Sequence, residues 1–342
     1  MLVIVADDLT GALDAAAPFA ARGFYVEVAL APEAIDDVLK TGPDVVSVNL
    51  GSRELSPALA RHRTVATLAA LPSGSRIFKK VDSRLKGNIV AELDAMSFGS
   101  ALVAPAIPAF GRVVMSGSVQ GFGVDTPISI AEKLGPHATK AVIPDVSTEA
   151  EMRALLQDAE RSGADLLIGA RGLAEALAER MSGGQQARAA EVSAGPALFV
   201  IGSRDPITLA QIDTLRDGLA LSYLPAPNGR LSVANDTGGA ITLVQAVPGD
   251  GEVTPEAVSE ALAESVCPGL VERAGTLLLS GGATAEAVLK KMGIQRFRLL
   301  GECLPGLGLA EVDGRCIIAK SGGFGAPGTL KEIAEAVLRK MG

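Results

Sequence analysis

The chain has 342 residues, of which 48% are hydrophobic and 20% are charged, and it carries a formal net charge of −8. This composition is that of a globular protein, and the length fits two domains of moderate size. The negative charge argues against nucleic acid and anionic lipid as main partners, and an aromatic content of 3% leaves few rings on which bases could stack. A small anionic ligand stays compatible, because it needs only a local cluster of donors.

The three cysteines, Cys267, Cys303 and Cys316, lie far apart in the sequence and are odd in number. Their spacing fits neither a disulfide framework nor a zinc site, which favours reduced thiols. The N-terminus leads directly into a strand-like stretch, and no apolar run approaches the roughly 20 residues that a membrane span needs. We therefore expect a cytoplasmic protein without a membrane partner, and the sequence leaves homo-oligomerisation open.

Short apolar runs alternate with helical patterns along the first half of the chain. The predicted strands are 2–6, 25–30, 45–49, 76–80, 101–104, 141–143 and 165–168, and the predicted helices include 11–22, 56–71, 88–96, 148–161 and 172–181. This alternation predicts a mostly parallel sheet with helices on both faces. The strands are continuously apolar, as expected when both faces are buried.

A polar, glycine-containing stretch at 183–195 is the predicted linker. After it, the predicted strands are 197–201, 240–245, 276–279 and 316–319, and the predicted helices are 208–217, 255–271, 284–292 and 329–341. We therefore expect an α/β protein of two domains, 1–182 and 196–342, each a mostly parallel sheet flanked by helices, with an interdomain cleft. In such sheets ligands collect at the carboxyl ends of the strands.

Two adjacent carboxylates, Asp7 and Asp8, stand between the first predicted strand and its helix. Adjacent carboxylates repel each other unless a cation or a donor-rich ligand is present. They can bind Mg²⁺, accept hydrogen bonds from substrate hydroxyls or act as a base, whereas the plain structural alternative is that one of them caps the helix.

Cationic residues follow two further strands. Arg53 comes after the strand 45–49, where it can clamp a carboxylate through two parallel hydrogen bonds, although a surface arginine is the alternative. The densest cluster, 79–88, follows the strand 76–80 and leads into a helix whose N-terminus favours anions. Lys80 and Asp82 point the same way if the strand persists, so they can share one substrate. The proline-rich loop 105–112 is either a pocket wall or a plain structural loop.

Three glycine-rich turns follow strands of the second domain: Gly202-Ser203, Ser280-Gly281-Gly282-Ala283-Thr284 and Lys320-Ser321-Gly322-Gly323. Glycines let backbone N–H groups approach a phosphate closely. Turns after strands of one sheet converge on one edge, which predicts a nucleotide-phosphate site. A Walker P-loop, a strict dinucleotide motif and a Ser-His-Asp hydrolase arrangement are not supported by the sequence.

Together these motifs resemble the four-carbon acid sugar kinase family, which includes threonate, erythronate and 3-oxo-tetronate kinases. The matching motifs cover nearly the whole chain in order: Ala6-Asp7-Asp8-Leu9-Thr10-Gly11-Ala12, Gly51-Ser52-Arg53, Lys79-Lys80-Val81-Asp82-Ser83-Arg84-Leu85-Lys86-Gly87-Asn88, 105–112, Gly202-Ser203 with Thr208 and Gln211, Ser280-Gly281-Gly282-Ala283-Thr284, and Lys320-Ser321-Gly322-Gly323-Phe324-Gly325. The chain departs from the family in its short 116–135 segment and in Arg204 and Asp205.

The resemblance implies an N-terminal sugar-acid domain, a C-terminal nucleotide domain, and ATP with Mg²⁺ as cofactors. The implied substrate contacts are Asp7, Asp8, Arg53, Lys80, Val81, Asp82 and Ser83. The implied ATP contacts are Ser203, Gly281, Gly282, Ala283, Thr284, Gly322 and Gly323. No metal ligand set is identified.

The predicted function is therefore ATP-dependent phosphorylation of a hydroxyl of a small sugar acid. In this hypothesis Lys80 and Arg53 hold the carboxylate, and Asp8 or Asp82 takes or positions the hydroxyl proton. The alternatives are a ligase, a kinase for a different polyol acid, and a non-catalytic protein that binds a sugar acid and a nucleotide.

Overall fold

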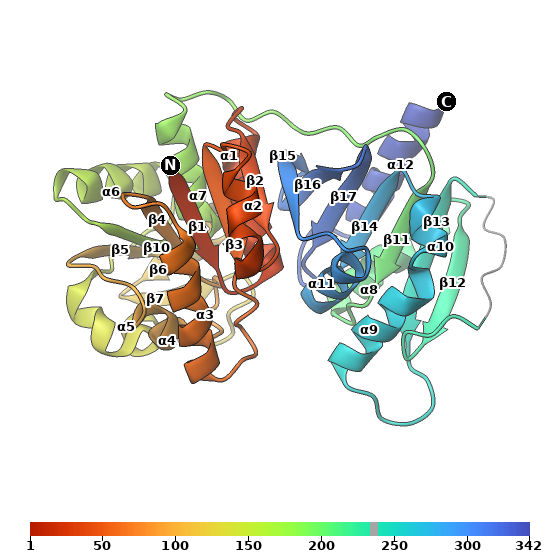
Figure 1. Cartoon of the computed structure of the whole chain (residues 1–342), viewed down its shortest axis with the longest axis horizontal. Coiled ribbons are helices and arrows are strands. Elements are labelled where there is room, and N and C mark those ends of the chain that lie inside the picture. The colour runs from red at the N-terminus through yellow and green to blue at the C-terminus, as the bar shows by residue number, and fades with distance from the viewer. Residues whose placement is uncertain (233–238) are drawn as a thin grey trace. The chain divides into compact units, whose positions relative to one another are not determined.

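The computed structural model describes residues 1–232 and 239–342, and the chain divides into two compact units, Met1–Ala187 and Arg188–Gly342 (Figure 1). Each unit has a mainly parallel sheet with helices packed on both faces. The predicted α/β class is confirmed, while the interdomain cleft stays a prediction. Within the described part of the chain, every helix is too short or too polar to cross a membrane.

The sheet of the first unit has the strand order β2-β3-β1-β4-β10-β5-β9, and all neighbours are parallel. Its strands are β1 (Leu2–Ala6), β2 (Val26–Ala29), β3 (Val45–Asn49), β4 (Arg76–Lys80), β5 (Ala101–Ala104), β9 (Ala141–Val142) and β10 (Leu166–Gly169). β-Branched residues such as Val3, Val5 and Val46 are fully buried, as the continuous apolar runs predicted. The three strands β3, β1 and β4 lie side by side at the centre and carry the candidate site.

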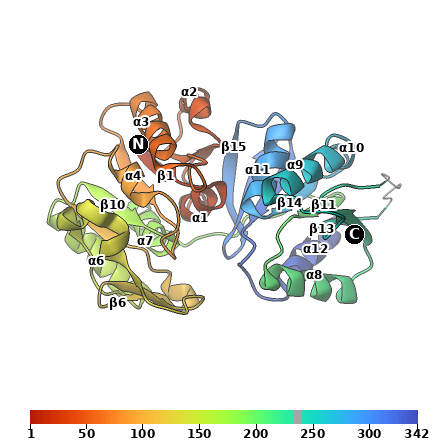
Figure 2. The same ribbon diagram turned by 90° about the horizontal axis from the view of Figure 1, so that it is seen from below.

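The helices of this unit are α1 (Leu9–Ala20), α2 (Ile35–Leu39), α3 (Pro57–Ala70), α4 (Ile89–Leu93), α5 (Ile130–Leu134), α6 (Glu149–Arg161) and α7 (Arg171–Met181). Helix α1 packs on α7, and α7 packs on α6, whereas α3 packs on α2 and α4. Figure 2 shows α1 and α7 on one side of the sheet and α3 and α4 on the other. The sheet is therefore covered on both faces, which leaves its strand ends as the place for polar side chains.

A small antiparallel sheet, absent from the sequence prediction, follows the proline-rich loop. It consists of β6 (Arg112–Met115), β7 (Ser118–Gly121) and β8 (Ile128–Ser129). The loop before it contains a single 3-10 turn, Pro108–Phe110, that ends at Gly111 with φ of +68°. Thus the segment predicted as a rigid loop ends in a hairpin strand, and Arg112 opens that strand.

The sheet of the second unit has the order β12-β13-β11-β14-β17-β16-β15. Its strands are β11 (Ala197–Ile201), β12 (Ser222–Pro227), β13 (Ile241–Val247), β14 (Thr276–Ser280), β15 (Arg296–Leu304), β16 (Leu307–Val312) and β17 (Arg315–Lys320). Pairing is parallel from β12 to β17 and antiparallel in β17-β16-β15. The central strands β11, β14 and β17 are neighbours, so the three predicted glycine turns leave the same edge.

The helices of the second unit are α8 (Pro206–Gly218), α9 (Pro255–Val266), α10 (Gly269–Glu272), α11 (Gly282–Lys291) and α12 (Thr329–Met341). Figure 2 shows α9 and α11 on one side of the sheet and α8 and α12 on the other. Ile212 from α8 and Leu330 from α12 join Phe199 of β11 in one buried apolar cluster. This cluster is the core beneath the β11 and β17 loops.

The sequence prediction for this unit was wrong about one helix and lacked three strands. The single helix predicted over 255–271 is two helices, because Pro268 has no N–H to continue the helical hydrogen bonds of α9. Strands β15 and β16 were not predicted, and neither was β12, which contains Pro225 and Pro227. Strand β12 lies at the edge of the order given above, where proline is tolerated.

Candidate functional site

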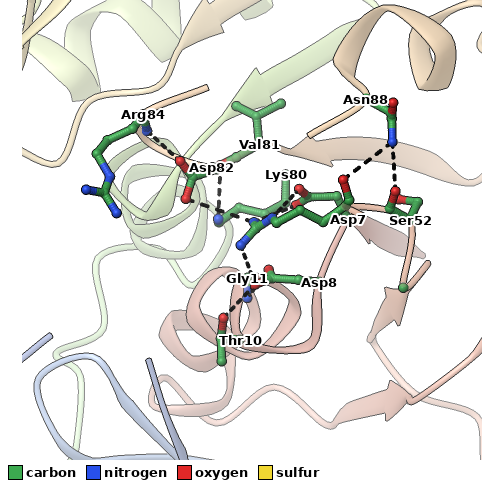
Figure 3. A network of polar contacts seen from close by, with 12 residues as sticks. Asp7, Asp8, Thr10, Gly11, Ser52, Lys80, Val81, Asp82, Arg84 and Asn88 are labelled. Atoms are coloured by element: carbon green, nitrogen blue, oxygen red, sulfur yellow. Dashed lines mark hydrogen bonds and ion pairs between the residues drawn. The ribbon is translucent and has the colours of Figure 1, made fainter. Parts of the chain in front are cut away.

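The site in the first unit forms where three adjacent parallel strands end (Figure 3). Ala6, the last residue of β1, is in register with Asn49 of β3 and with Lys80 of β4. The loops that begin after these residues therefore start level with one another. This register, rather than proximity in sequence, brings together the carboxylates after β1, the arginine after β3 and the polar run after β4.

Arg53 is the centre of this cluster. Its Nε donates to Oδ2 of Asp7 at 2.8 Å and its Nη2 to Oδ1 of Asp7 at 3.0 Å, while its Nη1 donates to Oδ2 of Asp8 at 2.6 Å. The third carboxylate, Asp82, lies 3.9 Å from Nη2. One guanidinium thus lies among three carboxylates, and the edge of Arg53 that could clamp a substrate carboxylate is occupied by Asp7.

Asp8 also caps helix α1, as the structural alternative for this residue proposed. Its Oδ1 accepts from the backbone N–H of Gly11 at 2.8 Å, and its Oδ2 accepts from Thr10 Oγ1 at 2.7 Å. Burial, the largest influence, raises the pKa of Asp8 above its ordinary value; the nearby charge of Asp7 raises it further, and Arg53 opposes both. Asp8 is therefore a more basic carboxylate than an exposed aspartate.

Asp82 has the opposite electrostatic character. Its burial raises the pKa, but the cations of Lys80 and Arg53, together with the backbone N–H of Arg84 that donates to Oδ1 at 2.8 Å, lower the pKa of Asp82 below its ordinary value. The ammonium of Lys80 donates to the carbonyl of Val81 at 3.0 Å. The side chain of Val81 is itself buried, so this residue offers the site only its backbone.

A buried network that sequence analysis did not assign supports the Arg53 loop. Lys79 and Glu92 are both buried and form an ion pair of 2.7 Å, and Glu92 also accepts a hydrogen bond from the hydroxyl of Ser52. The amide of Asn88 donates to the carbonyls of Ser52 at 2.8 Å and of Leu55 at 2.9 Å. Helix α4 thereby fixes the loop that carries the central arginine. The sequence signal for this network was Lys79, a lysine within a strand that was predicted to be buried.

Ser83, the last of the predicted substrate contacts, meets a residue from the small sheet. Its hydroxyl accepts from Nη1 of Arg112 at 2.5 Å, and the same guanidinium donates from Nε and Nη2 to the carbonyl of Phe122 at 2.9 and 2.8 Å. Arg112 was predicted only as the end of a loop. The hairpin, which sequence analysis missed, brings this second arginine to the Lys80–Ser83 segment.

The glycine turns of the second unit converge as predicted. Ile201 of β11 is in register with Ser280 of β14, and Ser280 is in register with Lys320 of β17. The N–H groups of Gly202 and Ser203 donate to the carbonyl of Ser280 at 3.0 and 3.2 Å, and the N–H of Gly281 donates to the carbonyl of Lys320 at 2.9 Å. The three turns are thus linked by their own backbones.

Side-chain space in these turns is very limited. A Cβ at Gly322 would lie 2.1 Å from Oγ of Ser203, and a Cβ at Gly202 would lie 2.0 Å from Oγ1 of Thr284. Gly281 adopts φ of +105°, which an L-residue with a side chain rarely adopts. Glycine is therefore required at Gly202 and Gly322 because the side chains of the neighbouring turns fill the space beside them.

Helix α11 begins at Gly282, so Gly282, Ala283 and Thr284 form its first turn. The free N–H groups there carry partial positive charge and suit a phosphate. Thr284 itself is buried and its hydroxyl lies 3.3 Å from that of Ser259. Its side chain therefore packs inward, and its backbone belongs to the helix N-terminus.

Lys320 is a buried cation behind the third turn. Its ammonium donates to Thr208 Oγ1 at 3.1 Å and to the carbonyls of Ser321 at 3.0 Å and Gly322 at 3.3 Å. Burial lowers the pKa of Lys320 to about 8, with Asp205 opposing the shift. Lys320 therefore holds the carbonyls of Ser321 and Gly322 in place and adds a positive charge next to the third turn.

Among the described residues, no group of three or more acidic, histidine or cysteine side chains is arranged so that it could hold a metal ion. The residues do fit an ion that arrives with phosphate. Asp205 caps α8 through Oδ1, which accepts from Ile207 at 2.9 Å, and its other oxygen lies 3.1 Å from where a Cβ of Gly323 would be. Mg²⁺ commonly uses one or two carboxylates together with substrate phosphates and water.

Family models of known proteins match the two halves of the chain separately. A family model described as a sugar-binding N-terminal domain matches residues 2–129, and one described as a nucleotide-binding C-terminal domain matches residues 232–330. The chain is thus of the class of α/β proteins that match a sugar-binding model in the first half and a nucleotide-binding model in the second.

Relatives extend over almost the whole chain. A D-threonate kinase of Cupriavidus necator is 29% identical, and one of Bordetella bronchiseptica is 27% identical; the alignments cover 96% and 98% of this chain and 96% of each relative. A 3-oxo-tetronate kinase of Methylobacterium radiotolerans is 25% identical over 94% of the chain and 95% of the relative. The chain belongs to the four-carbon acid sugar kinase family, whose members are phosphotransferases with an alcohol group as acceptor.

Solved structures confirm the fold. A crystal structure from Salmonella typhimurium LT2 has a TM-score of 0.74 at 19% identity, covering 100% of this chain and 99% of that one. The Haemophilus influenzae protein HI1011 has a TM-score of 0.70 at 18% identity, with 99% of both chains covered. The alignment with the Cupriavidus relative has 405 positions for a chain of 342 residues, so that relative carries insertions that are absent here.

Proposed function

We propose that this chain is an ATP-dependent kinase that phosphorylates a hydroxyl of a four-carbon sugar acid such as D-threonate, D-erythronate or 3-oxo-tetronate. The observation that carries the proposal is the cluster of Asp7, Asp8 and Asp82 around Arg53 at the ends of three adjacent strands. Carboxylates held in this way can accept hydrogen bonds from the hydroxyls of a polyol substrate. The names of the relatives support the substrate class.

The carboxylates of Asp8 and Asp82 are suited to different tasks. The pKa of Asp8 is raised, mainly by burial, whereas that of Asp82 is lowered by Lys80 and Arg53 despite its burial. Opposed shifts of this kind identify acid and base roles in enzyme sites. We assign the general base to Asp8, which takes the proton of the attacked hydroxyl, and hydroxyl orientation to Asp82.

ATP is proposed to bind the glycine turns of the second unit. The N–H groups of Gly282 and Ala283 at the start of α11 would contact its phosphates, and Ser203, Gly281, Thr284, Gly322 and Gly323 would border them. Lys320 supports this role because it anchors Gly322 and adds positive charge. Mg²⁺ would lie near Asp205 and supply charge neutralisation on the transferred phosphoryl group.

The test is an ADP-release assay with purified protein, ATP and a panel of four- and five-carbon sugar acids. We expect ADP formation that depends on a four-carbon acid, and we expect Asp8→Asn to reduce turnover by about 100-fold or more, the range of a lost general base. Activity on a five-carbon acid alone would instead favour a kinase for another polyol acid. ATP-dependent thermal protection without ADP formation on any acid would favour a non-catalytic binding protein.

A further inference from the structure

The charges around Arg53 leave open which residues bind the carboxylate of the acid, a question that rests on the proposed function. Three carboxylates, Asp7, Asp8 and Asp82, surround the two cations Arg53 and Lys80. The bidentate edge of Arg53 is already used by Asp7. This cluster therefore suits hydroxyl groups, and an anionic group brought beside it would meet an excess of negative charge.

Arg112 is a second arginine next to the same segment, and it is firmly placed. Three hydrogen bonds fix its half-buried side chain: one to the hydroxyl of Ser83 and two to the carbonyl of Phe122. Gly123 lies directly behind it, because a Cβ there would come within 2.9 Å of Nη2, and Gly123 adopts φ of +70°. A guanidinium held in this way is preorganised, which lowers the entropy cost of binding a ligand.

The charge of Arg112 is not neutralised by the protein. Among the described residues, no carboxylate lies within ion-pair distance of its guanidinium, in contrast to Arg53. Burial and the positive charge of Arg84 lower the pKa of Arg112, while the negative charge of Asp82 opposes them. Two cations that repel each other gain most from an anion, since it relieves the repulsion and supplies acceptors for the remaining donors.

We propose that Arg112, together with the hydroxyl of Ser83 and the charge of Arg84, binds the carboxylate of the sugar acid. Asp82 and Ser83 are consecutive, so a short acid bound at Arg112 would have its hydroxyls beside Asp82 and the Arg53 cluster. In this arrangement the acid group is recognised by arginines and the polyol by carboxylates. Arg112 is then the residue that selects an acid over a neutral polyol.

The variant Arg112→Met tests the proposal, with Arg61→Met as a control that removes one exposed cation from helix α3 of the same unit. We expect Arg112→Met to raise the KM for D-threonate or D-erythronate by about 10- to 100-fold, the loss expected for a charge-assisted hydrogen bond. The KM for ATP should stay unchanged, and Arg61→Met should match the wild type in both constants. Arg112→Lys should recover part of the loss, because it keeps the charge but not the planar fork.

A neutral substrate distinguishes recognition of the carboxylate from a structural role. With the tetritols threitol and erythritol, which lack the carboxylate, kcat/KM should be equal in the wild type and in Arg112→Met. An equal loss on acid and tetritol, or no loss on the acid, would overturn the proposal. If Arg112→Met does not fold, Ser83→Ala should show the same selective effect at smaller size, and absence of that effect would also overturn it.

Direct binding separates this inference from the proposed function. Calorimetric titration with D-threonate, D-erythronate and 3-oxo-tetronate needs no turnover, so it reports on Arg112 even if ADP is never formed. We expect binding of one of these acids to the wild type that weakens at least 10-fold in Arg112→Met. Failure of the wild type to bind any of the three acids, or equal affinity in the variant, would contradict the role of Arg112.

Discussion

Arg53 binds Asp7 through two parallel hydrogen bonds, from Nε to Oδ2 at 2.8 Å and from Nη2 to Oδ1 at 3.0 Å. A planar guanidinium can do this and still reach Asp8 with its third nitrogen, whereas a lysine ammonium cannot. We predict that Arg53→Lys lowers kcat/KM for the sugar acid by about 100-fold or more, because three carboxylates lose their common partner. Steady-state kinetics on the preferred acid check this, with the KM for ATP expected to change little. A near-wild-type kcat/KM would show that the cluster needs only one positive charge.

The pH dependence of kcat/KM should distinguish the two candidate bases. A general base acts when deprotonated, so activity falls as the pH drops through its pKa. The pKa of Asp8 is raised above 3.8 and that of Asp82 is lowered below it, so our assignment to Asp8 predicts an acidic limb above 3.8. The measurement is a profile of kcat/KM for the wild type and for Asp82→Asn. A limb below 3.8 in the wild type would move the role of base to Asp82.

The ion pair between Lys79 and Glu92 lies in the interior, where an unpaired charge is costly. We predict that Glu92→Gln lowers the free energy of unfolding by about 3–5 kcal/mol, because it leaves the ammonium of Lys79 buried without its partner. Urea denaturation measures this. The double variant Lys79→Met with Glu92→Gln should recover much of the loss, since it removes the stranded charge and keeps an acceptor for Ser52.

A surface pair provides the control for that experiment. Arg153 and Glu179 form an ion pair of 3.3 Å in which both side chains are substantially exposed. Glu179→Gln should change the free energy of unfolding by less than about 1 kcal/mol. An equally small effect of Glu92→Gln would contradict the interpretation of the Lys79–Glu92 pair as a buried support of the Arg53 loop.

We predict that Gly322, in the third glycine turn of the second unit, does not tolerate a side chain because Ser203 fills the space beside it. Gly322→Ala places a Cβ 2.1 Å from Oγ of Ser203, so either the hydroxyl or the turn must move. We expect the KM for ATP to rise about 10-fold or more, with little change in the KM for the acid. Gly269→Ala is the matched control, because its Cβ would meet nothing within 4 Å. Similar ATP kinetics in the two variants would argue that the third turn does not contact the nucleotide.

Much of the first unit could be predicted from sequence because β1 and β3 are runs rich in valine and the strands alternate with helical patterns. The bounds of β1, β3 and β4 agree with the prediction, and the strand-end rule therefore located Asp7, Asp8, Arg53 and Lys80. The parallel register then placed them together. In the second unit the same logic brought the three glycine turns to one edge.

The features of the site that could not be predicted from sequence depend on contacts between segments that are distant in the chain. Arg112 reaches Ser83 only because the β6–β7 hairpin supports it, and the pairing of Lys79 with Glu92 needs α4 to lie against β4. No local pattern encodes either contact. The occupied edge of Arg53 could not be foreseen either, since an arginine after a strand has the same sequence signature whether it binds a ligand or the protein itself.

The proposed reaction moves a phosphoryl group from ATP to a hydroxyl of a sugar acid. The most direct measurement uses ATP labelled in its γ-phosphate and separates the products after incubation with D-threonate, D-erythronate or 3-oxo-tetronate. We predict that the label appears in a phosphorylated four-carbon acid and that Asp8→Asn slows its appearance by about 100-fold or more. Label that stays in ATP, or is released only as inorganic phosphate with every acid, would contradict the account.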